Sequence, residues 1–408
     1  MSKVSATLNC QNIVAEREKS GLPVYNYGLG DNPLRQHVFF TESLRKHAEQ
    51  KDYTSSQGVE PLKTAIKKTF STCEYKVHGT VVGNGLKELI FIMQLSFEGM
   101  IFHVTPSWVS YREQLKILNR LDKLVEIPTS IENNYKLSPQ VLDDALQMYK
   151  NEPKMIIFNN PNNPTGVHYT PEEIKNLANV LNNNNCIVLA DEIYLNLVHS
   201  SDTPTESICK YIPHLTVRGS SVSKDMGCGG YRSGWLTFPK ELDGLFRVCV
   251  SNSSSIYSSS VTPIQYATAD MLNNEDMFNA HCAMTNNIFR NVVQDVTDIL
   301  DTTELQYAHP TSAWYMFISF ENCTEFLNKY KITDSEELMT LLVNTLGIVT
   351  VPGSAFNDTG INLRFSLVDI DNDAISTDYN PLTGKFNGYC YRNITEGFKK
   401  LVEFIESA

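Results

Sequence analysis

Met155-Ile-Ile-Phe158 is the first of three short apolar runs that decide the fold of this 408-residue chain. The other two are Cys186-Ile-Val-Leu-Ala190 and Leu215-Thr-Val217, and polar residues come soon after each of them. Between about Tyr53 and Pro239 such runs alternate with helical patterns, which is typical of a parallel sheet built from βαβ units. The sequence therefore predicts an α/β fold with a mostly parallel central sheet, whose ligands would collect at the carboxyl ends of the strands.

A smaller α/β domain is predicted beside this sheet. The segment from about Glu275 to Leu300 favours one long helix. After it we expect a strand near Ala313–Phe320, a helix near Ser335–Leu346 and a strand near Asn362–Ser366. This order of elements predicts a βαβ-like unit.

Composition narrows the class of protein. The chain has 34 Lys and Arg against 46 Asp and Glu, a net charge of −12, which argues against a nucleic-acid partner or a membrane surface. The nine cysteines form no CxxC pair and no cluster with histidine at zinc spacing, so we expect free thiols, a reducing compartment and no metal site. Met1–Asn9 is polar, unlike a signal peptide, and no apolar run approaches the roughly 18 residues that span a bilayer. We expect a cytoplasmic protein.

The segment Ser221-Val-Ser-Lys-Asp-Met-Gly-Cys-Gly-Gly-Tyr-Arg-Ser-Gly-Trp235 carries the most specific chemistry. The amine of Lys224 can form an imine with an aldehyde. Arg232 and the hydroxyls of Ser221 and Ser223 can hold a phosphate. Together these groups could bind two ends of one phosphorylated aldehyde, although a lysine in a Gly/Ser loop is by itself more often a solvated surface residue.

Polar residues also follow the other two apolar runs. Asp191 and Tyr194 come directly after Cys186–Ala190, where a carboxylate beside a pyridine nitrogen would keep that nitrogen protonated. Asn163 lies in Asn160-Pro-Asn-Asn-Pro-Thr-Gly166, a turn that is rigid enough to aim its amide. Taken singly, the acidic pair at the end of the strand Cys186–Ala190 is more often a helix cap, and a plain rigid turn explains the asparagine equally well.

Two further motifs lie upstream. Gly83-Asn-Gly-Leu-Lys87 precedes an apolar helical run, so the backbone N–H groups of Leu86 and Lys87 could bind a phosphate. Pro106-Ser-Trp-Val-Ser-Tyr111 offers the ring of Trp108 for stacking on a planar cofactor, or simply for packing.

Taken in order, these motifs and Asn362-Leu-Arg364-Phe-Ser366 resemble the class I/II aminotransferases of the aspartate-aminotransferase fold, the fold type I pyridoxal-phosphate enzymes. The resemblance runs from about Gly28 to Ser366. It implies a three-layer α/β/α fold, with a large cofactor-binding domain at residues 46–290 and a small domain formed by residues 1–45 and 291–408. It also implies pyridoxal phosphate as cofactor, an L-amino acid and a 2-oxo acid as substrates, and a homodimer.

The resemblance assigns roles to individual residues. Lys224 matches the lysine that bonds the cofactor, Asp191 matches the partner of the pyridine nitrogen, and Tyr194 and Asn163 match the groups on the phenolic oxygen of the ring. Trp108 matches the stacking aromatic residue. The phosphate site would comprise Ser221, Ser223, Arg232 and the amides of Leu86 and Lys87.

Three more residues complete the comparison with the family. Tyr53 resembles the tyrosine that reaches the phosphate site of the neighbouring subunit. Arg364 matches the arginine that binds the substrate's α-carboxylate, with the backbone of Gly30 opposite it. Cys228 and Ser233 depart from the aliphatic residues usual in the lysine motif, and because these are packing positions the chemistry is not affected.

Substrate choice depends on Lys87. A bacterial-type subgroup of aspartate aminotransferases carries a lysine in this turn that reads the substrate's distal carboxylate, so we expect aspartate or glutamate as donor, although the turn here is one residue longer. Carbon–sulfur β-lyases and aminocyclopropane-carboxylate synthases share the fold, and Ser-Val-Ser-Lys-Asp-Met-Gly also resembles the latter. A transcription regulator on this fold would need a DNA-binding segment, and no basic helix-turn-helix pattern precedes Tyr53.

Overall fold

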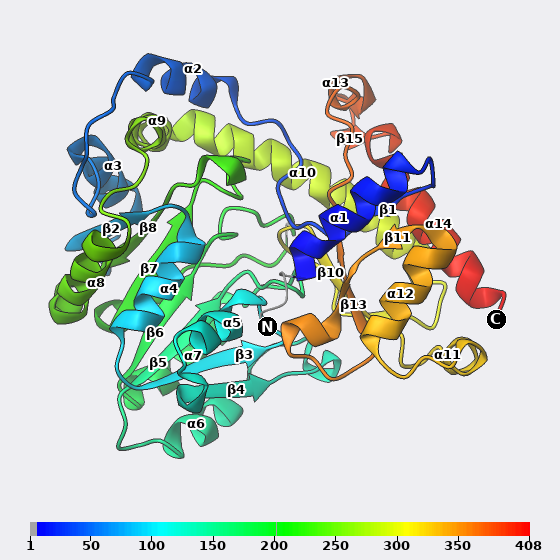
Figure 1. The fold of residues 1–408 in the computed structure, drawn as a ribbon, viewed down its shortest axis with the longest axis horizontal. Coiled ribbons are helices and arrows are strands. Elements are labelled where there is room, and N and C mark those ends of the chain that lie inside the picture. Colours follow the sequence, from blue (N-terminus) through cyan, green and yellow to red (C-terminus); the bar gives the residue numbers. More distant parts are fainter. Residues whose placement is uncertain (1–5, 201) are drawn as a thin grey trace.

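A seven-stranded sheet forms the centre of the computed structural model, which describes residues 6–200 and 202–408 (Figure 1). Its strand order is β2-β8-β7-β6-β5-β3-β4, and β8 is the strand that runs antiparallel to its neighbours. The strands are β2 (Gly79–Gly83), β3 (Met100–Thr105), β4 (Leu124–Pro128), β5 (Lys154–Asn159), β6 (Cys186–Asp191), β7 (Thr216–Ser221) and β8 (Gly234–Phe238). The predicted, mostly parallel sheet is confirmed, with Leu215 in a short 3-10 turn before β7 instead of in the strand.

Helices cover both faces of this sheet because its central strands bury side chains on both sides. Ile156 and Phe158 of β5 pack against α6 and α7, whereas Met155 and Ile157 pack against α4 and α8. The helices of this part are α3 (Glu60–Phe70), α4 (Leu86–Ser96), α5 (Ser110–Ile117), α6 (Pro139–Gln147), α7 (Pro171–Asn183), α8 (Asp243–Ile256) and α9 (Thr262–Asn273). The predicted three-layer α/β/α arrangement is therefore confirmed.

The C-terminal part has its own antiparallel sheet, of order β12-β13-β10-β9. Its strands are β9 (Gln306–Tyr307), β10 (Tyr315–Ser319), β12 (Val351–Pro352) and β13 (Asn362–Ser366), and its helices are α10 (Glu275–Leu300), α11 (Thr324–Tyr330), α12 (Ser335–Leu346), α13 (Ile375–Asp378) and α14 (Arg392–Glu406). A small hairpin, β14 (Tyr379–Asn380) and β15 (Lys385–Phe386), precedes α14. The expected helices at 275–300 and 335–346 are confirmed residue for residue.

The expected βαβ-like pairing of the last two strands is wrong. β10 and β13 are antiparallel, with Phe317 opposite Arg364. The chain returns from α12 through β11 (Ile348–Val349) and β12, and β12 also pairs antiparallel with β13. The strand parallel to β10 is therefore β12, and β13 lies between them.

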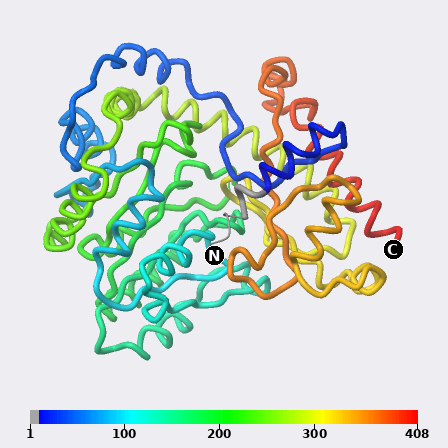
Figure 2. Tube along the Cα trace, viewed as in Figure 1, coloured from blue at the N-terminus to red at the C-terminus, as the bar shows by residue number. Residues whose placement is uncertain are grey.

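The N-terminal segment packs on the C-terminal part, as the trace in Figure 2 shows. Beyond α1 (Ala6–Lys19), β1 (Tyr25–Asn26) pairs parallel with β11, and Tyr27 packs against Phe398 of α14. By contrast, α2 (Val38–His47) lies on α9, and its Phe40 shares a core with Val59 and Leu62. The division at residues 45 and 290 stays a prediction, and its first five residues lie outside the described chain.

Candidate active site

A cavity of about 430 Å³ lies beyond the carboxyl ends of β5, β6 and β7, where it meets the smaller sheet. Most of the predicted site residues line it: Gly30, Leu86, Lys87, Trp108, Asn163, Asp191, Tyr194, Ser223, Lys224, Arg232 and Arg364. Motifs spread over more than three hundred residues therefore meet in one cavity.

Two predicted residues do not line the cavity. Ser221 is fully buried, and its hydroxyl accepts a hydrogen bond from the backbone N–H of Ser223 at 3.0 Å. Tyr53 is 92% exposed on the outer surface. Within this single chain, neither side chain reaches the space where a phosphate would bind.

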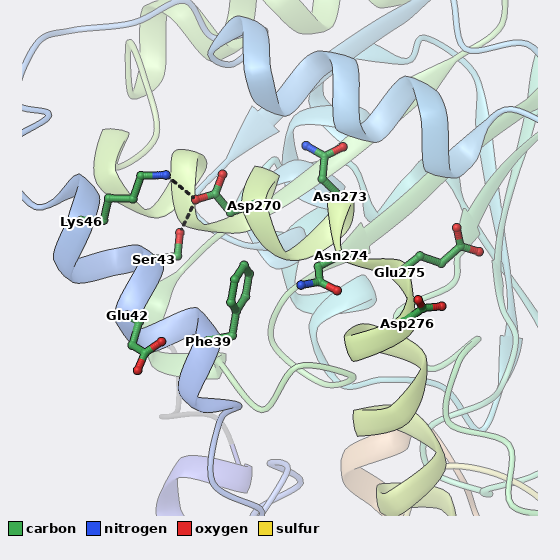
Figure 3. A pocket seen from close by; sticks show the side chains of 9 residues that line it. All are labelled: Phe39, Glu42, Ser43, Lys46, Asp270, Asn273, Asn274, Glu275 and Asp276. Carbon is green, nitrogen blue, oxygen red and sulfur yellow. Dashed lines mark hydrogen bonds and ion pairs between the residues drawn. The ribbon is translucent and has the colours of Figure 1, made fainter.

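A larger hollow of about 640 Å³ lies elsewhere, between α2, α9 and the start of α10 (Figure 3). Asp270 there accepts a hydrogen bond from Ser43 at 2.7 Å and pairs with Lys46 at 3.6 Å. None of the predicted site residues lines this hollow, so its size does not mark it as the active site.

The N-terminus of α4 forms one end of the site cavity. Gly85 caps this helix with φ at 92°, and no side chain caps the first N–H groups. The guanidinium of Arg232 donates to the Asn84 carbonyl at 2.9 Å, and a Cβ on Gly85 would lie 2.3 Å from its Nη2. Glycine is therefore required here, and it brings a cation to an open helix N-terminus, which is an anion-binding arrangement.

Lys87 adds a second cation at this end. Its Nζ lies 5.1 Å from the centroid of the Trp108 ring, within the cavity. Burial, with the positive charges of Arg232 and Lys224 nearby, lowers the pKa of Lys87. A phosphate or carboxylate bound among these cations would relieve their mutual repulsion.

Asp191 lies at the end of β6, at the floor of the cavity. Its Oδ2 accepts a hydrogen bond from the hydroxyl of Tyr111 at 2.6 Å, and its Oδ1 accepts from the backbone N–H of Ile193 at 3.3 Å. Burial raises the pKa of Asp191 to about 6, while both hydrogen bonds act in the opposite direction. Tyr111 has no predicted role in the sequence motif Pro106–Tyr111, yet it lines the cavity, one helical turn after Trp108.

Replacing Tyr111 with phenylalanine should shift the pH dependence of cofactor binding. A carboxylate must be ionised to pair with a protonated pyridine nitrogen, so affinity should fall as the pH drops through the pKa of Asp191. Loss of the hydrogen bond raises that pKa further, and the midpoint of the affinity loss should rise by about one pH unit. Cofactor dissociation constants measured between pH 5 and 8 test this, and superimposable curves for wild type and Tyr111→Phe would refute it.

Arg364 lies at the opposite end of the cavity and is 1% exposed. Its Nη1 donates to the Asn163 side chain at 3.1 Å and its Nη2 to the Gly28 carbonyl at 2.6 Å. Its Nε has no hydrogen-bond partner, and no carboxylate of the described residues pairs with its guanidinium. Burial lowers the pKa of Arg364. A buried guanidinium without an anion is a ready site for a carboxylate.

Sequence reasoning missed Tyr315, which joins both sides of the cavity. Its hydroxyl lies 2.8 Å from that of Tyr194 and donates to the Gly30 carbonyl at 3.2 Å, while its ring lies 4.8 Å from the Arg364 guanidinium. A Cβ on Gly30 would lie 2.3 Å from this hydroxyl, which explains the glycine. Nothing local in the sequence signals Tyr315, because its partners are far away along the chain.

The cavity fits pyridoxal phosphate. An amine that can bond an aldehyde, a carboxylate for a pyridine nitrogen, and a cationic helix N-terminus for a phosphate line one space of suitable size. Asn159 lines the same floor, and its amide donates to the Asp191 backbone at 3.0 Å.

The comparisons with known proteins agree with this chemistry. The family model "Aminotransferase class I and II" matches residues 23–375. A probable aspartate/prephenate aminotransferase of Aquifex aeolicus is 28% identical over 374 residues, covering 89% of this chain and 91% of that protein. An aspartate aminotransferase of Bacillus subtilis is 27% identical over 376 residues, with the same two coverages.

Solved structures confirm the fold. A double mutant of Thermus thermophilus aspartate aminotransferase superimposes with a TM-score of 0.81 at 21% identity, covering 99% of this chain and 97% of that one. An aminotransferase from Mycobacterium tuberculosis gives 0.83 at 19% identity, covering 100% and 98%. The chain belongs to the class I and II aminotransferases. It is an aminotransferase that depends on pyridoxal phosphate.

No helix of the described chain has both the length and the apolar character needed to cross a membrane.

Proposed function

We propose that this aminotransferase takes its amino group from a dicarboxylic amino acid, aspartate or glutamate, and passes it to a 2-oxo acid. The observation that carries the proposal is the position of Lys87, an exposed side chain that lines the cavity with its amine 5.1 Å from the centroid of the Trp108 ring. A cation beside the substrate's side chain favours a distal carboxylate, whereas an apolar side chain would leave the cation unpaired. The aspartate aminotransferases among the relatives support the same choice.

Other cavity residues would hold the cofactor. Lys224 would bond the cofactor's aldehyde, Asp191 would pair with its pyridine nitrogen, and Arg232 with the α4 amides would hold its phosphate. When bound, the cofactor supplies an electron sink for the electron pair that is left on the substrate's Cα when its proton is removed.

The substrate would be held and deprotonated by groups of this chain alone. Arg364 and Asn163 would bind the α-carboxylate, which sets the direction of the Cα–H bond. The amine of Lys224, once free, would take that proton from Cα and deliver it two bonds away, to the carbon on the other side of the nitrogen. The hydroxyl of Tyr194 would bind the phenolic oxygen of the cofactor ring, and the hydroxyl of Tyr315 would hold that of Tyr194 in place.

Replacing Lys87 with alanine tests the donor preference. Loss of a hydrogen-bonded charge pair should lower kcat/KM for aspartate and glutamate by about 10- to 100-fold, and leave alanine and phenylalanine nearly unchanged. Lys116→Ala, which removes an exposed lysine of α5, is the matched control. Equal losses on all four donors would show that Lys87 does not read the distal carboxylate.

Incubations with amino acids that carry a sulfur leaving group on the side chain, run beside the four donors above, separate transamination from the lyase chemistry of related enzymes. A transaminase needs a 2-oxo acid to turn over and releases no ammonia. A β-lyase or cyclopropane-forming lyase would act without the 2-oxo acid, so ammonia or a cyclised product in its absence would overturn the proposal.

We also propose a homodimer in which each cavity receives Tyr53 from its partner subunit. The segment that carries Tyr53 is tied down, because Thr262 donates to the Asp52 carbonyl at 2.8 Å and Gln265 donates to Thr54 at 3.2 Å, yet the ring itself is exposed. Ile256 at the end of α8 and Val261 just before α9 are about half exposed, as residues of an interface would be in one chain alone.

Mixing two inactive variants tests this arrangement. In a hybrid of Lys224→Ala and Tyr53→Ala subunits, one cavity combines an intact Lys224 with an intact Tyr53. Random exchange of equal amounts should restore about a quarter of the wild-type activity. No recovery despite exchange, or an active monomer in sedimentation, would contradict the shared site. The cytoplasmic location expected from the sequence stays a prediction.

A further inference from the structure

The amine of Lys224 makes a contact that the roles above do not use. It donates to the Gly30 carbonyl and lies 3.5 Å from Oδ1 of Asp31. Asp31 lines the cavity at its mouth, where its side chain is 46% exposed. Among the described residues, this is the carboxylate within 4 Å of the Lys224 amine.

The carboxylate of Asp31 is held in place from several sides. Its Oδ1 accepts a hydrogen bond from the backbone N–H of Asn32 at 3.0 Å. The Asn32 amide in turn donates to the Lys224 carbonyl at 2.7 Å, which ties this segment to the lysine's own backbone. A Cβ on Gly229 would lie 2.9 and 3.1 Å from the two Asp31 oxygens, so the glycine leaves room for the carboxylate.

The other charged and titratable groups around this amine already have partners or the wrong sign. Lys87 of α4 repels it, and Arg232 and Arg364 are cations at the two ends of the cavity. Asp191 of β6 is engaged with Tyr111. Tyr194 and Tyr315 share a hydrogen bond between their hydroxyls.

We propose that Asp31 is a positioning residue that stabilises a positive charge on the Lys224 nitrogen, both as the free amine and in its bond to the cofactor. The inference rests on the proposed role of Lys224. The bond itself forms from amine and aldehyde with loss of water, and the proton on its nitrogen comes from solvent. A positive charge on that nitrogen draws electrons from the adjacent carbon, which favours attack by the substrate's amine.

The pH titration of the loaded enzyme's absorbance tests the proposal without reference to turnover. The cofactor–lysine bond absorbs at longer wavelength when its nitrogen is protonated. In Asp31→Asn the midpoint of this change should fall by about one pH unit, because an opposite charge within reach has been removed. Asp31→Glu should restore most of the shift. Asp373→Asn is the control. It removes an exposed carboxylate that pairs with Arg35, four residues after Asp31, and should leave the midpoint unchanged.

A second variant keeps the test decisive if Asp31→Asn fails to take up cofactor. Gly229→Ala leaves the charge in the chain but pushes the carboxylate away, so it should lower the midpoint as well. The double variant should shift no further than Asp31→Asn alone, since both changes remove one interaction. A midpoint that stays put or rises in Gly229→Ala or Asp31→Asn overturns the proposal. If Lys224 does not bond the cofactor at all, the result is different, because Lys224→Ala would then keep the absorbance of the cofactor–lysine bond.

Discussion

Replacing Lys224 with alanine is expected to lower kcat by about 10⁴-fold or more and to remove the long-wavelength absorbance of the loaded enzyme. One side chain would both bond the cofactor and carry the proton, so its loss removes two contributions at once. Steady-state rates and an absorbance spectrum of the purified variant measure the two effects.

Lys224→Arg sharpens this experiment. Arginine keeps the positive charge but cannot lose a proton to attack an aldehyde, so this variant should be as inactive as the alanine variant. Wild-type absorbance in either variant would mean that another amine bonds the cofactor, and the assignment of the whole cavity would fall.

Replacing Arg364 with leucine is expected to lower kcat/KM for amino acids by about 10²- to 10³-fold. The guanidinium is buried and aimed by Asn163 and Gly28, so a carboxylate would meet it already desolvated. Loss of one partner of such a buried charged pair typically costs 3–5 kcal/mol, which at about 1.36 kcal/mol per tenfold is a factor of roughly 150 to 5,000.

Two controls separate lost binding from lost structure. Amines without an α-carboxylate should react equally slowly with wild type and Arg364→Leu. Arg364→Lys keeps a point charge but not the two-pronged geometry, and should recover only part of the activity. A loss of the same size for carboxylate-free amines would show that the substitution damages the fold and not a carboxylate site.

The central strands could be predicted from sequence because β5, β6 and β7 bury side chains on both faces. They therefore appear as unbroken apolar runs, and the polar residues after them mark the edge of the sheet where ligands bind. Lys224 and Asp191 were accessible to this reasoning because each belongs to a local motif.

What the sequence could not give were contacts without a local pattern. β12 has two residues, too few to show any periodicity in the sequence. The prediction therefore passed over β12 and took β13 as the first strand after α12. Tyr315 and Asp31 meet their partners across 285 and 193 residues of chain. Ser221 lies in a suitable motif, but its buried hydroxyl accepts a hydrogen bond from the Ser223 backbone and does not line the cavity, so its role in binding the phosphate stays a prediction.

The guanidinium of Arg364 also has a consequence for how this protein reaches its native state. Its two hydrogen-bond acceptors are 336 and 201 residues away along the chain, so three remote segments must dock before the side chain is aimed. Contacts of such sequence separation form late, because the loops that they close are entropically costly. The capacity to bind a substrate carboxylate therefore arises only once the segments around Gly28, Asn163 and Arg364 have come together, and a nascent chain that still lacks β13 cannot form this carboxylate site.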